Sequence, residues 1–73
     1  MAYHVEIGGP AHLYARAVPA GADAVGVIRR DNGEVGALLR FHTGDYAQMN
    51  DNAIRALDRR EVLCAMSEGF PAR

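Results

Sequence analysis

Three histidines and one cysteine are the side chains that could hold a metal ion or support acid–base or nucleophilic chemistry. They are His4, His12, His42 and Cys64. No two histidines lie two or four residues apart, the spacing that places side chains together on one strand or helix. We therefore expect solvated histidines, and we expect Cys64 to be a small buried hydrophobic residue. The sequence predicts no catalytic residue, no metal ligand and no cofactor.

Two other patterns that could support catalysis or phosphate binding are incomplete. Ser67 is the only serine, and it lies in a predicted helix without the strand–turn–helix setting of a nucleophile elbow. The pair at 8–9 has no glycine-rich motif around it, and the chain contains no lysine to complete a P-loop. A protein that acts by binding, and not as an enzyme, is therefore the expectation.

The arginines near the predicted helix start are more informative. Arg59 and Arg60 lie in the first turn, where the positive end of the helix dipole disfavours cations by about 0.3 kcal/mol or more. With Arg55 on the preceding predicted strand, they form a candidate contact site for an acidic protein surface or for phosphate. The alternative is a mixed surface in which Asp51, Asp58 and Glu61 offset the arginines.

Aromatic and apolar residues add further candidates. Tyr3, Tyr14 and Tyr46 either form a contact platform or pack at the core edge with their hydroxyls in water. Of these, Tyr46 is counted among the candidate contact residues. Ile28 and Leu38 are predicted as an apolar pair on an otherwise polar sheet face, which makes them a further candidate contact site.

The faces of that sheet follow from its clearest hairpin, at Asn32–Gly33 between two apolar runs. A two-residue loop would mix polar and apolar side chains on both faces. A three-residue loop at 31–33, with Gly33 in a left-handed conformation, sets Arg30 opposite Glu34. The second register is predicted because it gathers one apolar face. The residues of that face are Val25, Val27, Val35, Ala37, Leu39 and Phe41.

The remaining strands are predicted at 3–7, 11–18, 46–49 and 53–57. A helix is predicted over 59–68, with Asp58 as N-cap, Leu57 and Val62 as a hydrophobic staple and Gly69 just beyond its end. Its apolar stripe is expected to cover the apolar sheet face. That stripe consists of Val62, Leu63 and Met66.

These elements predict an α+β fold. It consists of an antiparallel meander of five or six short strands with one C-terminal helix packed on one face, in a single small domain over residues 1–73. The 73 residues are 49% hydrophobic and 23% charged, as in a folded domain. A core of this size supplies about 3–5 kcal/mol, so a partner surface would add useful burial.

The net charge and the cysteine count restrict the expected partners and the expected cellular compartment. The net charge of −1 disfavours general nucleic-acid binding, which depends on excess positive charge. A single cysteine cannot form an internal disulfide, and no stretch is long and apolar enough to span a membrane. We therefore expect a cytoplasmic protein that is neither exported nor embedded in a membrane.

The stretch GDYAQMNDNAIRALDRREV, residues 44–62, resembles the C-terminal part of short uncharacterised proteins carried by bacteria, phages and other mobile elements. The resemblance implies a small accessory protein that acts by binding, such as a phage-borne inhibitor of the anti-CRISPR type. It brings no functional residue with it.

The leading hypothesis is a non-enzymatic protein-binding module that contacts a protein partner, or itself as a homodimer. Its basis is the small core and the presence of sheet edges ready to pair. The main alternative is a nucleic-acid-binding module that uses Arg55, Arg59 and Arg60, with Arg29, Arg30 and Arg40 as further candidates. A third hypothesis is an enzyme with Cys64 or a histidine as catalyst.

Overall fold

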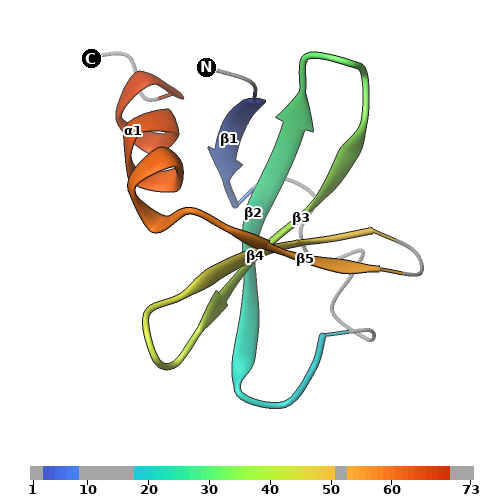
Figure 1. The fold of residues 1–73 in the computed structure, drawn as a ribbon, viewed down its shortest axis with the longest axis vertical. Coiled ribbons are helices and arrows are strands. Elements are labelled where there is room, and N and C mark those ends of the chain that lie inside the picture. Colours follow the sequence, from blue (N-terminus) through green and yellow to red (C-terminus); the bar gives the residue numbers. More distant parts are fainter. Residues whose placement is uncertain (1–2, 9–17, 51–52, 70–73) are drawn as a thin grey trace.

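The computed structural model describes residues 3–8, 18–50 and 53–69 (Figure 1). In chain order they form β1 (Tyr3–Ile7), β2 (Ala22–Arg30), β3 (Val35–Phe41), β4 (Tyr46–Met49), β5 (Ile54–Leu57) and α1 (Arg59–Gly69). Each strand pairs antiparallel with the next, giving one sheet in the order β1-β2-β3-β4-β5. The predicted α+β meander with its helix is confirmed. The strand predicted at 11–18 lies, except for its last residue, outside the described residues.

Left-handed glycines close the β2–β3 and β3–β4 hairpins. Gly33 has a φ of +95° and Gly44 a φ of +97°, a conformation that costs glycine little. At the first hairpin, the Arg30 N–H donates to the Glu34 carbonyl at 2.8 Å. The predicted three-residue loop, with these two residues opposite each other, is confirmed.

A β-bulge in β2 changes the side on which Val25 lies. The β2–β3 register shifts between Ala24 and Gly26, so the intervening residue has no direct partner in β3. Val25 therefore packs on the face opposite to that of Val27. The prediction that both valines share one face is wrong, because a period-two pattern does not reveal an inserted residue.

Each sheet face carries a cluster of buried apolar residues. The helix-side cluster contains Tyr3, Val5, Ile28, Leu38, Val62 and Ala65. The far-side cluster contains Ala37, Leu39, Ala47 and Met49. The helix α1 packs mainly against β1 and covers the first cluster. It was expected on the other face, so the predicted placement of the helix is wrong.

The start of α1 agrees with the sequence signals. One carboxylate oxygen of Asp58 accepts the Arg60 N–H at 2.8 Å and the Glu61 N–H at 3.3 Å, which confirms the N-cap. Leu57 packs against the cluster that contains Val62, as a hydrophobic staple requires. The helix extends one residue beyond its predicted end.

The buried side of α1 differs from the predicted stripe. Val62 and Ala65 are buried and Met66 is partly buried, whereas Leu63 and Cys64 are exposed. Successive residues turn by about 100° around a helix, so positions 63 and 64 rotate away from the side that 62, 65 and 66 share. The predictions that Leu63 and Cys64 are buried are therefore wrong. Within the described residues, no helix has the length and hydropathy needed to cross a bilayer.

Candidate functional site

Two of the predicted contact residues lie in the core. Ile28 and Leu38 each have 0% exposure and belong to the helix-side cluster. The prediction that they form an exposed apolar pair is wrong, because α1 covers the sheet face that was expected to be polar. Neither side chain can contact a partner from this position.

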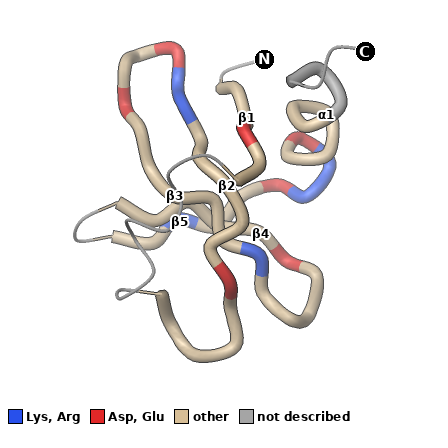
Figure 2. The backbone as a smooth tube through the Cα atoms, turned by 180° about the vertical axis from the view of Figure 1, so that it is seen from behind, with Lys and Arg blue, Asp and Glu red and all other residues tan. Residues whose placement is uncertain are grey.

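The three candidate arginines are exposed, but the structure describes no contact that joins them. Arg55 lies on β5, with Nη2 3.8 Å from Glu34 Oε2. Arg59 and Arg60 begin α1 directly after the Asp58 cap. Acidic and basic residues are interspersed over the described elements, and the adjacent pair Arg59–Arg60 lies between the acidic residues Asp58 and Glu61 (Figure 2). The mixed-surface alternative therefore describes these arginines better than a basic patch does.

On the helix side, a chain of polar side chains links the β2–β3 turn to β4. Arg30 Nε donates to Gln48 Oε1 at 2.7 Å, and Gln48 Nε2 donates to Asn50 Oδ1 at 2.7 Å. Asn50 Nδ2 in turn donates to Glu34 Oε2 at 2.9 Å. Gln48 is only 1% exposed, and its amide is hydrogen-bonded at both ends. The arrangement therefore works as a structural network, which the sequence analysis did not identify.

Two guanidinium groups share the carboxylate of that network. Arg30 Nε lies 3.9 Å from one oxygen of Glu34, and Arg55 Nη2 lies 3.8 Å from the other. Two positive charges thus face one negative charge. The Arg30 side chain is mostly buried, whereas that of Arg55 is 57% exposed. Arg55 therefore presents the unbalanced positive charge to solvent beside β5.

The strand β5 forms one edge of the sheet. It has β4 on one side and, within the described part of the chain, no strand on the other. The Asn50 N–H donates to the Ala53 carbonyl at 2.9 Å, and hydrogen-bonded and non-hydrogen-bonded pairs alternate along an antiparallel ladder. The main-chain groups of Arg55 therefore point toward β4, and those of Ile54 and Ala56 point away from the sheet.

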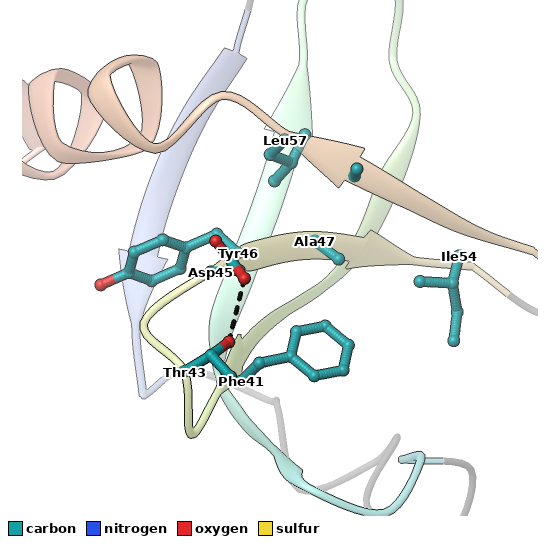
Figure 3. A pocket seen from close by; sticks show the side chains of 8 residues that line it. Phe41, Thr43, Asp45, Tyr46, Ala47, Ile54 and Leu57 are labelled. Carbon is teal, nitrogen blue, oxygen red and sulfur yellow. Dashed lines mark hydrogen bonds between the residues drawn. The ribbon is translucent and has the colours of Figure 1, made fainter.

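A hollow of about 480 Å³ opens beside β5, mainly on the far side of the sheet (Figure 3). Its floor is formed by two small residues, Ala47 and Ala56, which stand opposite each other in β4 and β5. Phe41 and Ile54 form its walls (Figure 3). Paired alanines between larger apolar side chains leave this space open. The full lining is Phe41, Thr43, Asp45, Tyr46, Ala47, Ile54, Ala56 and Leu57.

Tyr46 is the predicted contact residue that the structure brings to this hollow. It is half-buried, packs against the helix-side cluster and contributes to the lining. Neither the two alanines nor Phe41 is marked as a site residue by the sequence. The sequence reveals the hollow only through the register of β4 and β5, because the two alanines become neighbours once these strands are paired.

The titratable groups of the described residues suggest no metal site. His4 and His42 are exposed as predicted, and His42 Nε2 lies 3.5 Å from Asp23 Oδ2. His12 lies outside the described residues. Across residues 3–8, 18–50 and 53–69, no group of three His, Cys, Asp or Glu side chains could hold a metal ion.

Tyr3 departs from the expectation that tyrosine hydroxyls reach water. It is 2% exposed, and its hydroxyl is buried without a hydrogen-bond partner in the described structure. Burial, followed by the nearby carboxylate of Glu61, raises the pKa of Tyr3 above its usual value, although Arg30 opposes the change. The hydroxyl therefore stays protonated at neutral pH. Tyr14 lies outside the described residues.

The fold and this site define a small α+β domain in which, among residues 3–8, 18–50 and 53–69, no strand covers the β5 edge next to the apolar hollow. Comparisons with protein-family models, with curated proteins and with solved structures find no match to the chain. The binding properties of the β5 edge therefore have to follow from its own geometry and charge.

Proposed function

We propose that this chain is a small protein-binding module that acts without catalysis, by receiving an extended segment of another protein along β5. The observation that carries the proposal is the coincidence of the sheet edge with the hollow. The main-chain groups of Ile54 and Ala56 point away from β4, and both residues line the apolar space. Strand addition obtains affinity from main-chain hydrogen bonds and specificity from pockets for alternate side chains.

The hollow suits one large apolar side chain of the added strand. A residue opposite Ala56 would lie on the alanine floor, between Phe41 and Ile54. Burying such a side chain contributes about 1.5–3 kcal/mol, and each main-chain hydrogen bond adds about 1 kcal/mol. The gain comes without rearranging the core, because Ala56 is already at the surface.

The proposal extends to a cellular role. We propose a cytoplasmic accessory protein of a mobile element, such as an inhibitor of the anti-CRISPR type. Residues 44–62, which carry that resemblance, also contain β4, β5 and the start of α1. An inhibitor of this kind needs a contact surface and no catalytic centre. The β5 edge supplies such a surface.

Nucleic-acid binding through Arg55, Arg59 and Arg60 has less support. Arg55 lies beside the carboxylate of Glu34, and the net charge of the chain is −1. Phosphate binding draws its affinity from positive charge that displaces counterions. Acidic residues lie among the arginines of the described elements in Figure 2, so positive charge is not concentrated there.

The variant Ala56→Pro tests strand addition. It removes an outward N–H, and proline is tolerated at edge positions whose N–H does not take part in the ladder. The probe is a displayed library of random short peptides selected on the wild type, followed by dissociation constants for synthetic copies. We expect at least tenfold weaker binding by Ala56→Pro and by Ala56→Leu, which fills the hollow without changing the main chain.

Ala56→Ser is the matched control for Ala56→Pro, since it keeps both the N–H and a small side chain, and it should bind peptides more tightly than the Pro and Leu variants do. Circular dichroism establishes that each variant is folded. Equal peptide binding by the Pro, Leu and Ser variants, or a selection that yields no peptide, would contradict the proposal. So would binding of short DNA at low salt that is lost in Arg59→Ala/Arg60→Ala, which supports the nucleic-acid alternative.

A further inference from the structure

We infer that the segment received by β5 comes from a different protein, pairs antiparallel as the strands of this sheet do, and carries a large apolar residue followed directly by an acidic residue. The inference rests on the proposed function of the β5 edge and specifies the chemistry of the partner. Opposite residues of a strand pair point to the same sheet face, and successive residues point to opposite faces. A partner residue opposite Ala56 thus enters the hollow, and the next one stands opposite Arg55 on the helix side.

The apolar requirement follows from the shape of the far side. Along the row that crosses the sheet, Leu39 stands opposite Ala47, which stands opposite Ala56. The partner residue opposite Ala56 extends this row by one position. Phe41 and Ile54 flank the two alanines, so a large apolar side chain restores the apolar contacts that the alanines leave unmade.

The acidic requirement follows from the charges on the helix side. Arg30 and Arg55 share the single carboxylate of Glu34, which also accepts a hydrogen bond from Asn50. Because the Arg55 main chain is turned toward β4, the new pair at this position would be non-hydrogen-bonded. In such pairs the Cα atoms are only about 4.5 Å apart and the side chains are closest. An acid opposite Arg55 would balance the second guanidinium.

The other carboxylate near this end of β5 does not take that place. Asp58 follows the strand, but its Oδ1 atom accepts the N–H groups of Arg60 and Glu61 at the start of α1. Its charge is thus already directed at the helix terminus, where it is favourable. The position opposite Arg55 is therefore open to an acid from the partner.

A second copy of this chain fits the site less well. In a symmetric dimer, two β5 strands related by a twofold axis pair antiparallel, and the residue on the axis stands opposite its own copy. The two registers with the greatest overlap therefore place Arg55 or Ala56 on the axis. The first sets Arg55 against Arg55 of the second copy, and like charges directly opposite are destabilising. The second sets alanine against alanine and leaves the hollow empty. Neither register satisfies both sides of the sheet, whereas a partner with the inferred pair of residues does.

The test compares peptide selections on the wild type and on Arg55→Glu, with the same displayed library of random short peptides. Wild type should enrich a large apolar residue followed by Asp or Glu, and Arg55→Glu should enrich the same apolar residue followed by Lys or Arg. For a synthetic wild-type-selected peptide, replacing its acid with lysine should weaken binding by about threefold to tenfold on wild type and strengthen it on Arg55→Glu. Arg55→Gln is the matched control and should show neither charge preference.

Selected peptides that need the Ala56 N–H but show no acid after the apolar residue would overturn the inference and leave the proposed function standing. Light scattering is the second readout. A wild-type dimer that becomes a monomer in Ala56→Pro would identify a second copy as the occupant and would also overturn it. Peptides that bind Ala56→Pro and Ala56→Ser equally well would overturn both the inference and the proposed function.

Discussion

The two edges of the sheet are treated in opposite ways. At β1, the helix packs against the strand, and Tyr3 and Val5 are 2% and 3% exposed. At β5, Ile54 is 51% exposed, and the strand has a neighbour on one side only within the described structure. The helix follows β5 in the chain but lies beside β1 (Figure 1). The helix thus covers one face of β1, the strand at the opposite end of the sheet from β5, and not the strand that leads into it.

This difference separates stability from binding. Buried apolar contacts hold the β1 end, and exposed edges without such contacts are where other chains can pair. A short edge strand with a central arginine also resists pairing with its own copy. The β5 edge therefore combines access for a suitable partner with protection against self-association.

The largest expected effect on the free energy of unfolding comes from truncating an isoleucine under α1, and the same truncation on β5 is the matched comparison. Ile28→Ala removes a fully buried side chain under α1 and should lower the free energy of unfolding by about 3 kcal/mol. Ile54→Ala removes a half-exposed side chain and should cost less than about 1 kcal/mol. Urea denaturation of both variants measures this difference. Similar losses would show that the two ends are equally important to stability.

The next effect concerns the pairing of β1 with β2. A side chain on Gly26 would overlap the Glu6 carbonyl oxygen and would lie 3.0 Å from Ile7 Cα. Because these atoms belong to the main chain of β1, Gly26→Ala should displace that strand and cost about 2 kcal/mol. Gly44→Ala is the control: it has open space but a left-handed φ, and it should cost about 1 kcal/mol. A Gly26→Ala loss no larger than that of the control would argue against close packing at this edge.

Local sequence signals were sufficient for the elements of the fold. Asn32–Gly33 predicted the first hairpin and its register, and Asp58 predicted the start of the helix. Both signals act within a few residues, so no tertiary information is needed to interpret them. The same locality explains why the strands were placed more accurately than the faces.

The faces could not be assigned because β2 and β3 carry apolar residues on both sides. Ile28 and Leu38 point to one side, and Val27 and Leu39 point to the other. A single apolar face was assumed, although these strands are buried on both sides. The bulge that diverts Val25 adds a shift that residue types alone do not mark.

The site was only partly predictable for a related reason. Exposed sheet edges were expected, and Arg55 and Tyr46 were among the candidate residues that lie near one. The hollow depends on the pairing of Ala47 with Ala56, which is a property of the β4–β5 register. Alanine in a strand gives no sign by itself of the empty space above it.

A smaller effect is expected from the cap of the helix that covers β1. Asp58→Ala removes the acceptor for the N–H groups of Arg60 and Glu61, and it should lower the free energy of unfolding by about 1 kcal/mol. Asp58→Ser retains an acceptor at the N-cap and should lose much less. Thermal unfolding followed by circular dichroism measures both variants. An equal loss in the two would assign the effect to charge and not to capping.

The smallest effect at neutral pH is expected for Tyr3→Phe on the protected strand β1. The Tyr3 hydroxyl has no partner in the described structure, and the Arg30 guanidinium over the ring, 5.2 Å from its centroid, would still face an aromatic ring. Removing a buried hydroxyl that has no hydrogen-bond partner relieves its desolvation cost, so the free energy of unfolding should rise slightly, by up to about 1 kcal/mol.

The difference between Tyr3→Phe and wild type should grow in alkaline solution. Burial, with a further contribution from Glu61, raises the pKa of Tyr3 in the folded state above its ordinary value of 10.0. The folded protein then holds this proton more tightly than the unfolded chain does. The free energy of unfolding is therefore undiminished below the pKa of the unfolded chain, and it falls as the pH rises through the higher pKa of the folded state. The Phe variant lacks this loss, whereas Tyr46→Phe, which keeps Tyr3, should retain it. Urea denaturation at neutral and alkaline pH measures the three proteins. Parallel alkaline losses in wild type and Tyr3→Phe would show that the β1 edge does not shield this hydroxyl.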